Sequence, residues 1–385
     1  MKIFAVCTSA AVLSLAAVPA PAQESAAFVV RLGRDTVAVE RFTRTADRIE
    51  GTIVNRTPRT SVRTYTAHLR PDGTVSRLEM SSRVANDSTM PPQMLTITTS
   101  PDTAHWRLTR GDAAQEGGFT PGMESFPWIY NVFGLVEPVV RYARSRGTET
   151  VHATAVLPGA LDSIRVVRKG ADSVLIYSIP GIMRVHTDAQ GRVLGAHSPE
   201  STLKVSAERL PSLDVMALAA DFAAREQRGQ GLGALSPRDS VVTRVDGAEV
   251  SVAYGRPAMR GRRIMGQVVP YGEVWRTGAD DATHFRTDRD LMVRGTRVPA
   301  GSYTLWTVPG PDGWTLVVNS QTGQWGTEYD AARDFARIPV AARRTSDEPV
   351  ELLTMRFDEP DCGEGATLII EWEHTRVLVP FTVVR

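Results

Sequence analysis

Short segments in which apolar and polar residues alternate, separated by turn residues, constrain the fold of this chain more than any other feature. Between residues 26 and 206 the alternation recurs many times, as in Thr36–Phe42 and in Thr64–Arg70, which runs into the turn Pro71–Gly73. Successive side chains of a strand point to opposite faces, so this pattern is typical of antiparallel sheets that bury one face. We therefore predict that residues 26–206 form an antiparallel β domain.

Two longer apolar stretches depart from this pattern and are predicted to be helices. Met123–Arg146 has extended apolar runs that include Phe133, and we expect this helical segment to pack on the sheet or over its open side. Leu213–Gln227 carries one apolar stripe and follows Ser212, a suitable N-cap residue. Glycines at positions 229, 231 and 233 then end the helix. Residues 207–235 are therefore predicted to be a helix and a Gly-rich linker between two domains.

Beyond the linker the alternation returns, so residues 236–385 are predicted to form a second β domain. Pro309–Gly313 has the composition of a hairpin turn, and Tyr329–Phe335 is predicted to be a short helix between strands. Many short strands joined by long loops indicate a β-sandwich of jelly-roll type. The predicted strands include Glu249–Arg256, Asp290–Val293, Ser302–Val308, Trp314–Asn319, Glu351–Phe357, Thr367–Glu373 and Val377–Val383.

The first residues have the three parts of a secretory signal. Lys2 supplies a positive start, a mostly apolar run follows, and Ala20–Ala22 is a suitable cleavage site. The apolar run is short for a membrane helix, which needs roughly 20 residues. We therefore predict that Met1–Ala22 is a signal peptide and that the mature protein is periplasmic or extracellular, with no integral membrane span left after signal removal. Retention of this segment as an anchor is the alternative.

The composition excludes several classes of partner and cofactor. The net charge of +1 at pH 7 predicts no bulk attraction to nucleic acid. Removal of the signal would also remove Cys7 and leave Cys362 as the single remaining cysteine, so no intrachain disulfide can form. The seven histidines show no metal-binding spacing, and no nucleotide-binding or nucleophile motif occurs. We therefore predict neither a metal nor any other cofactor.

The segment Tyr254–Thr283 combines five arginines, five glycines, two prolines, two tyrosines and one tryptophan. Glycine and proline set turns, whereas arginine and aromatic side chains bind anions, carboxylates and sugar-like surfaces. Arg256 follows Val250 and Val252 on the apolar face of its predicted strand. A buried guanidinium needs a partner, so Arg256 either forms an internal salt bridge or faces a ligand. The candidate internal partners are Glu273, Asp280 and Asp281.

Other arginines and tryptophans of this half leave the same two alternatives open. The loop Arg260–Arg263 is either a clamp for a phosphate, sulfate or carboxylate, or a solvated loop beside acidic residues. Trp275 and Trp325 lie in predicted loops beside glycine and arginine, where they either stack on a ligand or pack on the protein. Strand alternation instead predicts core positions for Trp306, Trp314 and Trp372.

Acid–base chemistry is another interpretation of the same region, with Asp280, Asp281 and His284 as the candidate acid and base. Adjacent carboxylates point in different directions, which counts against a glycosidase pair made of the two aspartates alone. Glu371 and Glu373 share a strand face about 7 Å apart, within the range of an inverting pair. Apolar residues occupy the opposite face of that strand, so these glutamates are expected to face solvent.

Six motifs occur in order in the C-terminal half. They are YGRP at Tyr254–Pro257, RGRRIMG at Arg260–Gly266, VVPYGEVWRTGADDAT at Val268–Thr283, VPAGSYTLWTVP at Val298–Pro309, NSQTGQWGTEYD at Asn319–Asp330 and the closing LIIEWEHTRVLVPF. Taken together they resemble a bacterial family catalogued as domain of unknown function 2911 (DUF2911). The resemblance covers roughly Ser236–Val384 and implies export, a largely β domain and no assigned activity. Two positions depart from the family pattern, which usually has Asn where Asp280 stands and an aromatic residue where Met265 stands. The N-terminal half resembles no family.

Three hypotheses about function follow. The leading one is a non-enzymatic exported protein that binds a small molecule, a glycan or a cell-envelope partner in an Arg/Trp-rich recess of the C-terminal domain. The second is a hydrolase of envelope polysaccharide or ester that uses Asp280, Asp281 or His284. The third makes the segment purely architectural. The residues predicted to surround the recess are Tyr254, Arg256, Arg262, Trp275, Arg276, Asp280, Asn319 and Trp325.

Overall fold

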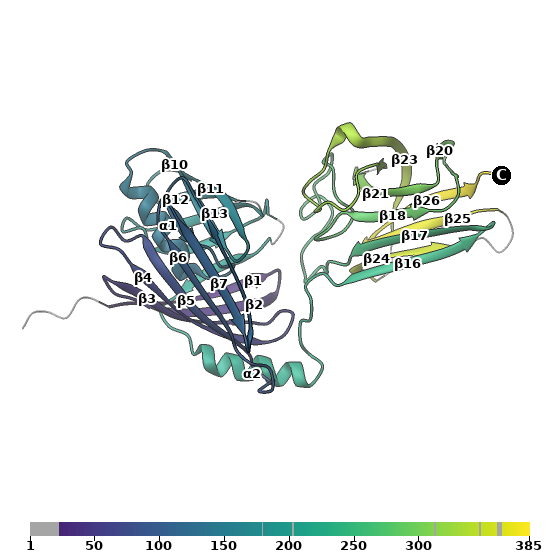
Figure 1. Cartoon of the computed structure of the whole chain (residues 1–385). Coiled ribbons are helices and arrows are strands. Elements are labelled where there is room, and N and C mark those ends of the chain that lie inside the picture. The colour runs from purple at the N-terminus through teal and green to yellow at the C-terminus, as the bar shows by residue number, and fades with distance from the viewer. Residues whose placement is uncertain (1–22, 179, 202–203, 312, 346–347, 360–363) are drawn as a thin grey trace, which may run out of the picture.

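The structure, a computed structural model, describes residues 23–178, 180–201, 204–311, 313–345, 348–359 and 364–385. The predicted signal peptide Met1–Ala22, the residue Cys362, and Asp312 of the predicted hairpin turn lie outside the described residues. Strands dominate both halves, and Figure 1 shows two β domains connected by the segment that follows helix α2. The predicted fold class is confirmed: an antiparallel N-terminal sheet with a packed helix, and a nearly closed C-terminal β-sheet domain. No described helix is long and apolar enough to cross a membrane.

The described strands of the N-terminal domain form one 15-stranded sheet. Neighbouring strands pair in antiparallel fashion except β9 and β10, which are parallel. The first strand, β1, pairs with the last, β15, and this pairing joins two series of hairpins into one sheet. The strands are β1 Glu24–Leu32, β2 Asp35–Arg44, β3 Arg48–Asn55, β4 Ser61–Leu69, β5 Val75–Val84, β6 Gln93–Thr99, β7 Ala104–Arg110, β8 Ala113–Phe119, β9 Ser125–Pro127, β10 Thr150–Leu157, β11 Ala160–Arg168, β12 Ser173–Ser178, β13 Gly181–Thr187, β14 Val193–His197 and β15 Ser206–Leu210.

Helix α1 (Phe133–Ser145) packs on one face of this sheet, but it begins later than the sequence predicted. Ser125–Pro127 forms β9 instead of helix, and Asn131 adopts a φ of 65°, which a right-handed helix does not accept. The ring of Phe133 stacks on Phe28 of β1, with centroids 4.9 Å apart. The helix is therefore held by contacts with the sheet at its very first residue.

Helix α2 (Val215–Gln227) covers the opposite face of the first strands, as Figure 1 shows below β1 and β2. Its N-cap is Asp214, whose Oδ1 accepts the N–H groups of Met216 and Ala217, and not Ser212 as predicted. Two helices thus bury both faces of β1, where Phe28 belongs to the core under α1 and Val29 to the core under α2. This double burial explains the unbroken apolar run in β1.

The C-terminal domain folds its described strands into a nearly closed sheet. The long strand β23 makes the closure, because its first part pairs with β22 and its last four residues pair with β26. The strand order is β16-β17-β18-β21-β22-β23-β26-β19-β20, and β25 pairs with both β24 and β26. The bounds are β16 Arg238–Val245, β17 Ala248–Gly255, β18 Thr283–Thr287, β19 Leu291–Val293, β20 Thr296–Val298, β21 Gly301–Val308, β22 Trp314–Asn319, β23 Asp334–Arg344, β24 Val350–Asp358, β25 Ala366–Glu373 and β26 Thr375–Val383.

The core of this domain follows the predicted alternation. Val250, Val252 and Tyr254 of β17 are fully buried, and Trp306, Trp314 and Trp372 are buried at their predicted strand positions. The predicted helix Tyr329–Phe335 is reduced to one 3₁₀ turn, Ala331–Arg333, because the residues from Asp334 onward pair with β22 as part of β23.

One contact between the two domains uses a residue of the arginine-rich segment. Arg260 is buried, and its Nη1 donates a 2.6 Å hydrogen bond to Asp35 Oδ2 of β2. The backbone N–H of Arg34 donates to the carbonyl oxygen of Arg260. A Cβ atom on Gly33 would clash with that carbonyl group, so the turn between β1 and β2 needs glycine at this position.

Candidate ligand-binding recess

Two of the predicted recess residues are in the interior of the C-terminal domain. Tyr254 is fully buried, and its hydroxyl oxygen accepts the N–H of Met355 at 2.7 Å. Asn319 is also fully buried, and its amide nitrogen donates to the carbonyl oxygen of Asp330 and to Asp334 Oδ1. Their polar atoms are used inside the fold, so the prediction that they contact a ligand is corrected.

Arg256 is paired internally, which decides between its two alternatives. Its three nitrogens donate to the carbonyl oxygen of Leu353 at 3.0 Å, to Asp239 Oδ2 at 3.1 Å and to Thr354 Oγ1 at 3.0 Å. The carboxylate partner is Asp239, and not Glu273, Asp280 or Asp281. The antiparallel pairing of β16 with β17 places Asp239 opposite Tyr254, two residues before Arg256.

The Arg260–Arg263 loop does not form the predicted three-arginine clamp. Arg260 binds Asp35 of the other domain, and Arg262 donates to the carbonyl oxygens of Met259 and Ala258 at 2.9 and 2.7 Å. Burial lowers the pKa of the Arg262 guanidinium, and the neighbouring Arg260 lowers it further. These two side chains brace the loop, and Arg263 alone is left exposed to solvent.

Trp275 packs on the protein instead of standing free. Its ring stacks on Trp372 with centroids 5.9 Å apart and an interplanar angle of 19°, and it meets Trp314 edge-on at 6.2 Å. The backbone of Trp275 pairs with Thr307 of β21. Three tryptophans from a loop, β22 and β25 therefore form one aromatic cluster in the core.

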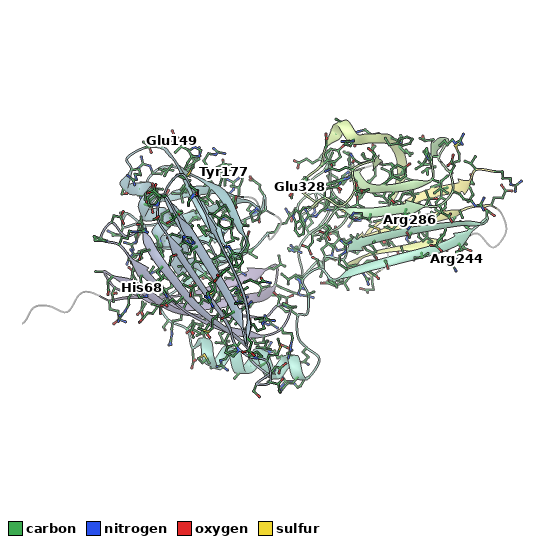
Figure 2. All side chains as sticks on the ribbon, viewed as in Figure 1. His68, Glu149, Tyr177, Arg244, Arg286 and Glu328 are labelled. Carbon is green, nitrogen blue, oxygen red and sulfur yellow. The ribbon has the colours of Figure 1, made fainter. Side chains whose placement is uncertain are left out.

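The remaining predicted recess residues are Arg276, Asp280 and Trp325. They lie where the loop before β18 contacts the loop after β22. Asp281 forms a β-bridge with Trp325, and the N–H of Gly326 donates to the carbonyl oxygen of Asp280. Trp325 is 41% exposed. Burial raises the pKa of the Asp280 carboxyl, although Arg276 opposes this shift. Figure 2 shows Glu328 of the same loop on the side of the domain that faces the N-terminal sheet.

Two of the three candidate acid and base residues, Asp281 and His284, have partners within the protein. Arg238 Nη1 donates to Asp281 Oδ2 at 2.9 Å, and His284 Nε2 accepts the N–H of Gly323 at 3.0 Å. Acceptance at Nε2 places the proton of a neutral imidazole on Nδ1, which is buried without a partner among the described atoms. Glu371 is held by Arg356 and Arg376, and Glu373 Oε2 accepts the N–H of Met265.

A recess of about 550 Å³ lies elsewhere in the C-terminal domain, at the ends of β23 and β25. Three arginines line it: Arg263 from the loop, and Arg343 and Arg344 from the end of β23. All three are exposed, and no hydrogen bond or ion pair joins their side chains to another residue among those described. Like charges that share a concave surface repel one another, and a bound anion relieves that repulsion.

Aromatic and polar side chains complete the lining of the recess. Tyr271 is 44% exposed there, whereas Trp314 is buried and forms part of the wall. Glu373 and His374 contribute the turn between β25 and β26. Glu373 has a φ of 55°, a left-handed conformation that suits the two-residue turn between the paired residues Trp372 and Thr375.

Sequence reasoning identified only part of this recess. Arg263 and Trp314 were singled out for other reasons, as a member of a clamp and as a core residue. Arg343, Arg344 and His374 were missed, because they are separated from the arginine-rich segment by more than one strand. The usable signal was the Arg343-Arg344 pair at the end of a strand, since adjacent residues on a regular strand cannot both be directed into the core.

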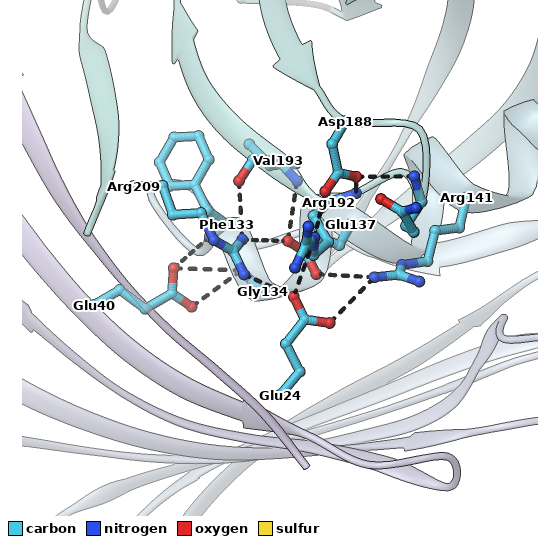
Figure 3. Close-up of polar contacts among 11 residues, drawn as sticks. Glu24, Glu40, Phe133, Gly134, Glu137, Arg141, Asp188, Arg192, Val193 and Arg209 are labelled. Carbon is cyan, nitrogen blue, oxygen red and sulfur yellow. Dashed lines mark hydrogen bonds and ion pairs between the residues drawn. The ribbon is translucent and has the colours of Figure 1, made fainter. Parts of the chain in front are cut away.

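A buried polar network in the N-terminal domain, drawn in Figure 3, connects helix α1 to the sheet. Glu40 of β2 is fully buried and accepts the N–H of Phe133 at 2.6 Å, the N–H of Gly134 and the hydroxyl of Tyr65 at 2.6 Å. Burial raises the pKa of the Glu40 carboxyl to about 7. Helix α1 has no side-chain cap of its own, so Glu40 supplies the missing acceptors at its N-terminus.

A second buried carboxylate lies one turn further along α1. Glu137 is fully buried, and Arg209 of β15 donates to it at 2.7 Å, as does the N–H of Val193 at 3.0 Å. Arg209 also donates to Glu24, which in turn pairs with Arg141. Burial raises the pKa of Glu137, while Arg209 opposes the shift. This network docks the helix, and its acids are engaged by the protein's own donors.

We expect the stability of the N-terminal domain to fall as the pH rises from 5 to 8, with Glu40 as one cause. Its pKa is about 7 in the folded protein and 4.5 normally, so the folded state binds this proton more tightly. The resulting stabilisation is complete below pH 4.5 and is lost as the pH rises through 7. The shift corresponds to about 3 kcal/mol. Urea unfolding at several pH values should show a flatter profile for Glu40→Gln. An unchanged profile would contradict the raised pKa.

The known proteins and families that are similar to this protein match only parts of the chain. Residues 236–381 match the family model described as "Protein of unknown function (DUF2911)". No curated protein matches the chain. Among solved structures, a DUF1089 family protein from Pseudomonas aeruginosa is similar at 14% identity with a TM-score of 0.31, over 42% of this chain and 90% of that one. No family model matches the N-terminal half. The predicted resemblance is thus confirmed for the C-terminal part of the chain, whose residues 236–381 match the DUF2911 family model.

Proposed function

We propose that this is an exported, non-enzymatic two-domain β protein that binds a small anionic ligand in the recess of its DUF2911 domain. The observation that carries the proposal is the convergence of Arg263, Arg343 and Arg344 on one concave surface without acidic partners among the described residues. Most neighbouring arginines of the domain, such as Arg256, are engaged within the protein. The three recess arginines are therefore available to an external anion, and they share one concave surface.

The lining indicates the kind of anion. A guanidinium fork matches the oxygen geometry of a carboxylate, sulfate or phosphate. The exposed ring of Tyr271 offers a flat surface for a sugar ring or another planar group. Glu373 and His374 add hydrogen-bonding groups for hydroxyls. A phosphorylated or acidic sugar combines these features and has a size suited to a recess of about 550 Å³.

Titration calorimetry with glucose 6-phosphate, glucuronate and neutral glucose tests the proposal. We expect the two anions to bind and glucose not to bind. The double variant Arg343→Ala/Arg344→Ala should weaken anion binding at least about tenfold, because each charge-assisted hydrogen bond contributes about 1.5–3 kcal/mol. Binding should also weaken as salt increases.

Arg286→Ala is the matched control, because Arg286 is an exposed arginine of β18 outside the recess with no partner among the described residues. It should leave anion binding unchanged. Equal binding by the recess double variant and the control would refute the recess as the site. Absence of binding for every anion would refute the proposed function.

Export is part of the proposal and rests on the composition of Met1–Ala22. Mass spectrometry of the protein recovered from outside the cytoplasm should find a mature N-terminus near Gln23. Recovery of the chain with Met1 intact would contradict cleavage.

A further inference from the structure

The turn between β1 and β2 of the N-terminal domain docks on the loop that leads to the arginine recess. Figure 1 shows β1 and β2 on the side of the N-terminal sheet nearer the C-terminal domain. The N–H of Arg34 donates to the carbonyl oxygen of Arg260 at 2.9 Å, and Arg260 Nη1 donates to Asp35 Oδ2 at 2.6 Å. Among the described residues, the hydrogen bonds that join the two domains therefore converge on Arg260.

Arg260 occupies a turn position that usually holds a smaller residue. The turn Met259–Arg262 is closed by a hydrogen bond from its last N–H to its first carbonyl oxygen at 3.0 Å. Its central residues Arg260 and Gly261 have φ angles of 51° and 73°. Positive φ at both central positions is the pattern of type I′ turns, which prefer Asn, Asp and Gly there. Arginine is held at this position because its N–H donates to Glu351 Oε1 at 2.9 Å and its side chain binds Asp35.

The same turn is continuous with a residue of the recess. Arg263 follows the turn directly and lines the recess. The next residue, Ile264, is fully buried, and the N–H of Met265 donates to Glu373 Oε2 at 3.0 Å. Arg260 and Arg263 are three residues apart, so at most about 10 Å of chain separates them. Arg263 is thus held between an anchor that the N-terminal domain helps to supply and an anchor in the core of the C-terminal domain.

We infer that the turn between β1 and β2 positions Arg263, so that docking of the N-terminal domain strengthens anion binding in the recess. The inference rests on the proposed function and adds the second domain to it. Asp35 is not among the residues that line the recess, and it acts through Arg260 as a positioning residue. Polar contacts between the domains of a chain permit relative motion. By the same coupling, an anion bound to Arg263 must stabilise the docked arrangement of the domains.

Calorimetric titration of the full mature chain with glucose 6-phosphate tests this coupling. Asp35→Asn should weaken binding about fivefold, because a neutral amide holds the Arg260 guanidinium less firmly than a carboxylate does. Asp102→Asn is the matched control and should leave binding unchanged, because Asp102 is an exposed aspartate in the turn between β6 and β7 of the same domain. In the Arg263→Ala background Asp35→Asn should have no further effect, since both changes act through one side chain.

A second variant disturbs the contact without changing a charge. Gly33 has a φ of 60°, and a Cβ atom there would lie 2.2 Å from the carbonyl oxygen of Arg260. Gly33→Ala should therefore displace the turn and weaken glucose 6-phosphate binding at least about fivefold. The matched control is Gly111→Ala in the turn between β7 and β8, where φ is 56° and the nearest atom, of Pro91, lies at an ordinary 3.5 Å. Both variants carry similar backbone strain, and thermal melting checks that each is folded.

Amide hydrogen exchange of Arg34 measures the contact directly, because its N–H donates to the other domain. Saturating glucose 6-phosphate should slow this exchange about fivefold in the unmodified chain, since the coupling is reciprocal. Without ligand, Asp35→Asn should accelerate it. The inference is overturned if the unmodified chain binds but Asp35→Asn and Gly33→Ala bind as well as their controls, or if binding leaves the exchange of Arg34 unchanged. Failure of the unmodified chain to bind any anion would instead overturn the proposed function, and this coupling with it.

Discussion

Replacing Glu40 with alanine is expected to lower the free energy of unfolding of the N-terminal domain by about 3 kcal/mol at pH 6. The carboxyl group of Glu40 satisfies two N–H groups at the start of α1 and the hydroxyl of Tyr65. Alanine leaves all three donors without an acceptor in a place that water does not reach. An unpaired buried donor costs about 1–3 kcal/mol, and partial relaxation of the helix limits the total.

The surroundings of Glu40 leave little room for compensation. A Cβ atom on Gly134 would clash with the Tyr65 hydroxyl, and a Cβ atom on Gly51 would clash with the Tyr65 ring. The helix therefore lies close against the sheet at this point. Loss of Glu40 should first loosen the N-terminal turn of α1, which amide hydrogen exchange of residues 128–145 measures directly.

Glu50→Ala is the control for this prediction. Glu50 lies on the neighbouring strand β3, its side chain is 51% exposed, and its one ion-pair partner among the described residues is the exposed Arg48. Such a surface ion pair contributes about 0–1 kcal/mol, so chemical denaturation should show little change. A Glu40→Ala protein as stable as the control, with unchanged exchange in α1, would contradict the capping role.

Arg256→Ala is expected to lower the free energy of unfolding of the C-terminal domain by about 2–3 kcal/mol without weakening anion binding. The Arg256 guanidinium, directly after β17, donates to Leu353 and Thr354 of β24 and to Asp239 of β16. Its removal breaks these three hydrogen bonds. Urea denaturation and calorimetry on the same variant measure the two effects separately.

Arg256→Lys refines this prediction, because an ammonium group cannot reproduce the fork that reaches three acceptors at once. We expect it to recover less than half of the lost stability. Arg286→Ala, on the neighbouring strand β18 and labelled in Figure 2, should be neutral for stability as well as for binding. Weaker anion binding in Arg256→Ala at unchanged stability would restore the ligand-facing interpretation of this arginine.

Arg256→Ala and the double variant Arg343→Ala/Arg344→Ala together separate the architectural hypothesis from the binding hypothesis. Arg256, Arg260 and Arg262 have partners in the protein, and they support the view that most of the segment braces its own loops. Arg263 belongs to the recess instead. The unusual composition of the segment therefore serves mainly the scaffold, and the proposed ligand site takes one residue from it and the rest from strands that come later in the chain.

Local patterns predicted what depends on neighbours along the chain. Alternation in Glu249–Arg256 placed Val250, Val252 and Tyr254 on the buried face, and the structure confirms it. The same reasoning placed Trp306, Trp314 and Trp372 in the core. These predictions succeed because strand periodicity is a property of the backbone and needs no knowledge of which strands pair.

Partners across strands and domains could not be predicted in this way. Arg256 bonds to Asp239 because β16 pairs with β17 in one particular register. Arg260 bonds to Asp35, from which it is separated by 225 positions in the sequence. Helix α1 was predicted too long, since its start is set by Glu40 from β2 and by the turn at Asn131. The end of a helix without its own cap depends on acceptors that only the packed sheet supplies.

By itself the sequence determined a mainly β chain, the buried face of its strands and the relation of residues 236–381 to DUF2911. Only the tertiary structure decided which arginines are paired and which line the recess with Tyr271 and His374. The physical reason is that the apolar periodicity of a strand depends only on residues that are neighbours in sequence. The partner of a charged side chain depends instead on which distant acids the closed sheet brings within hydrogen-bond distance.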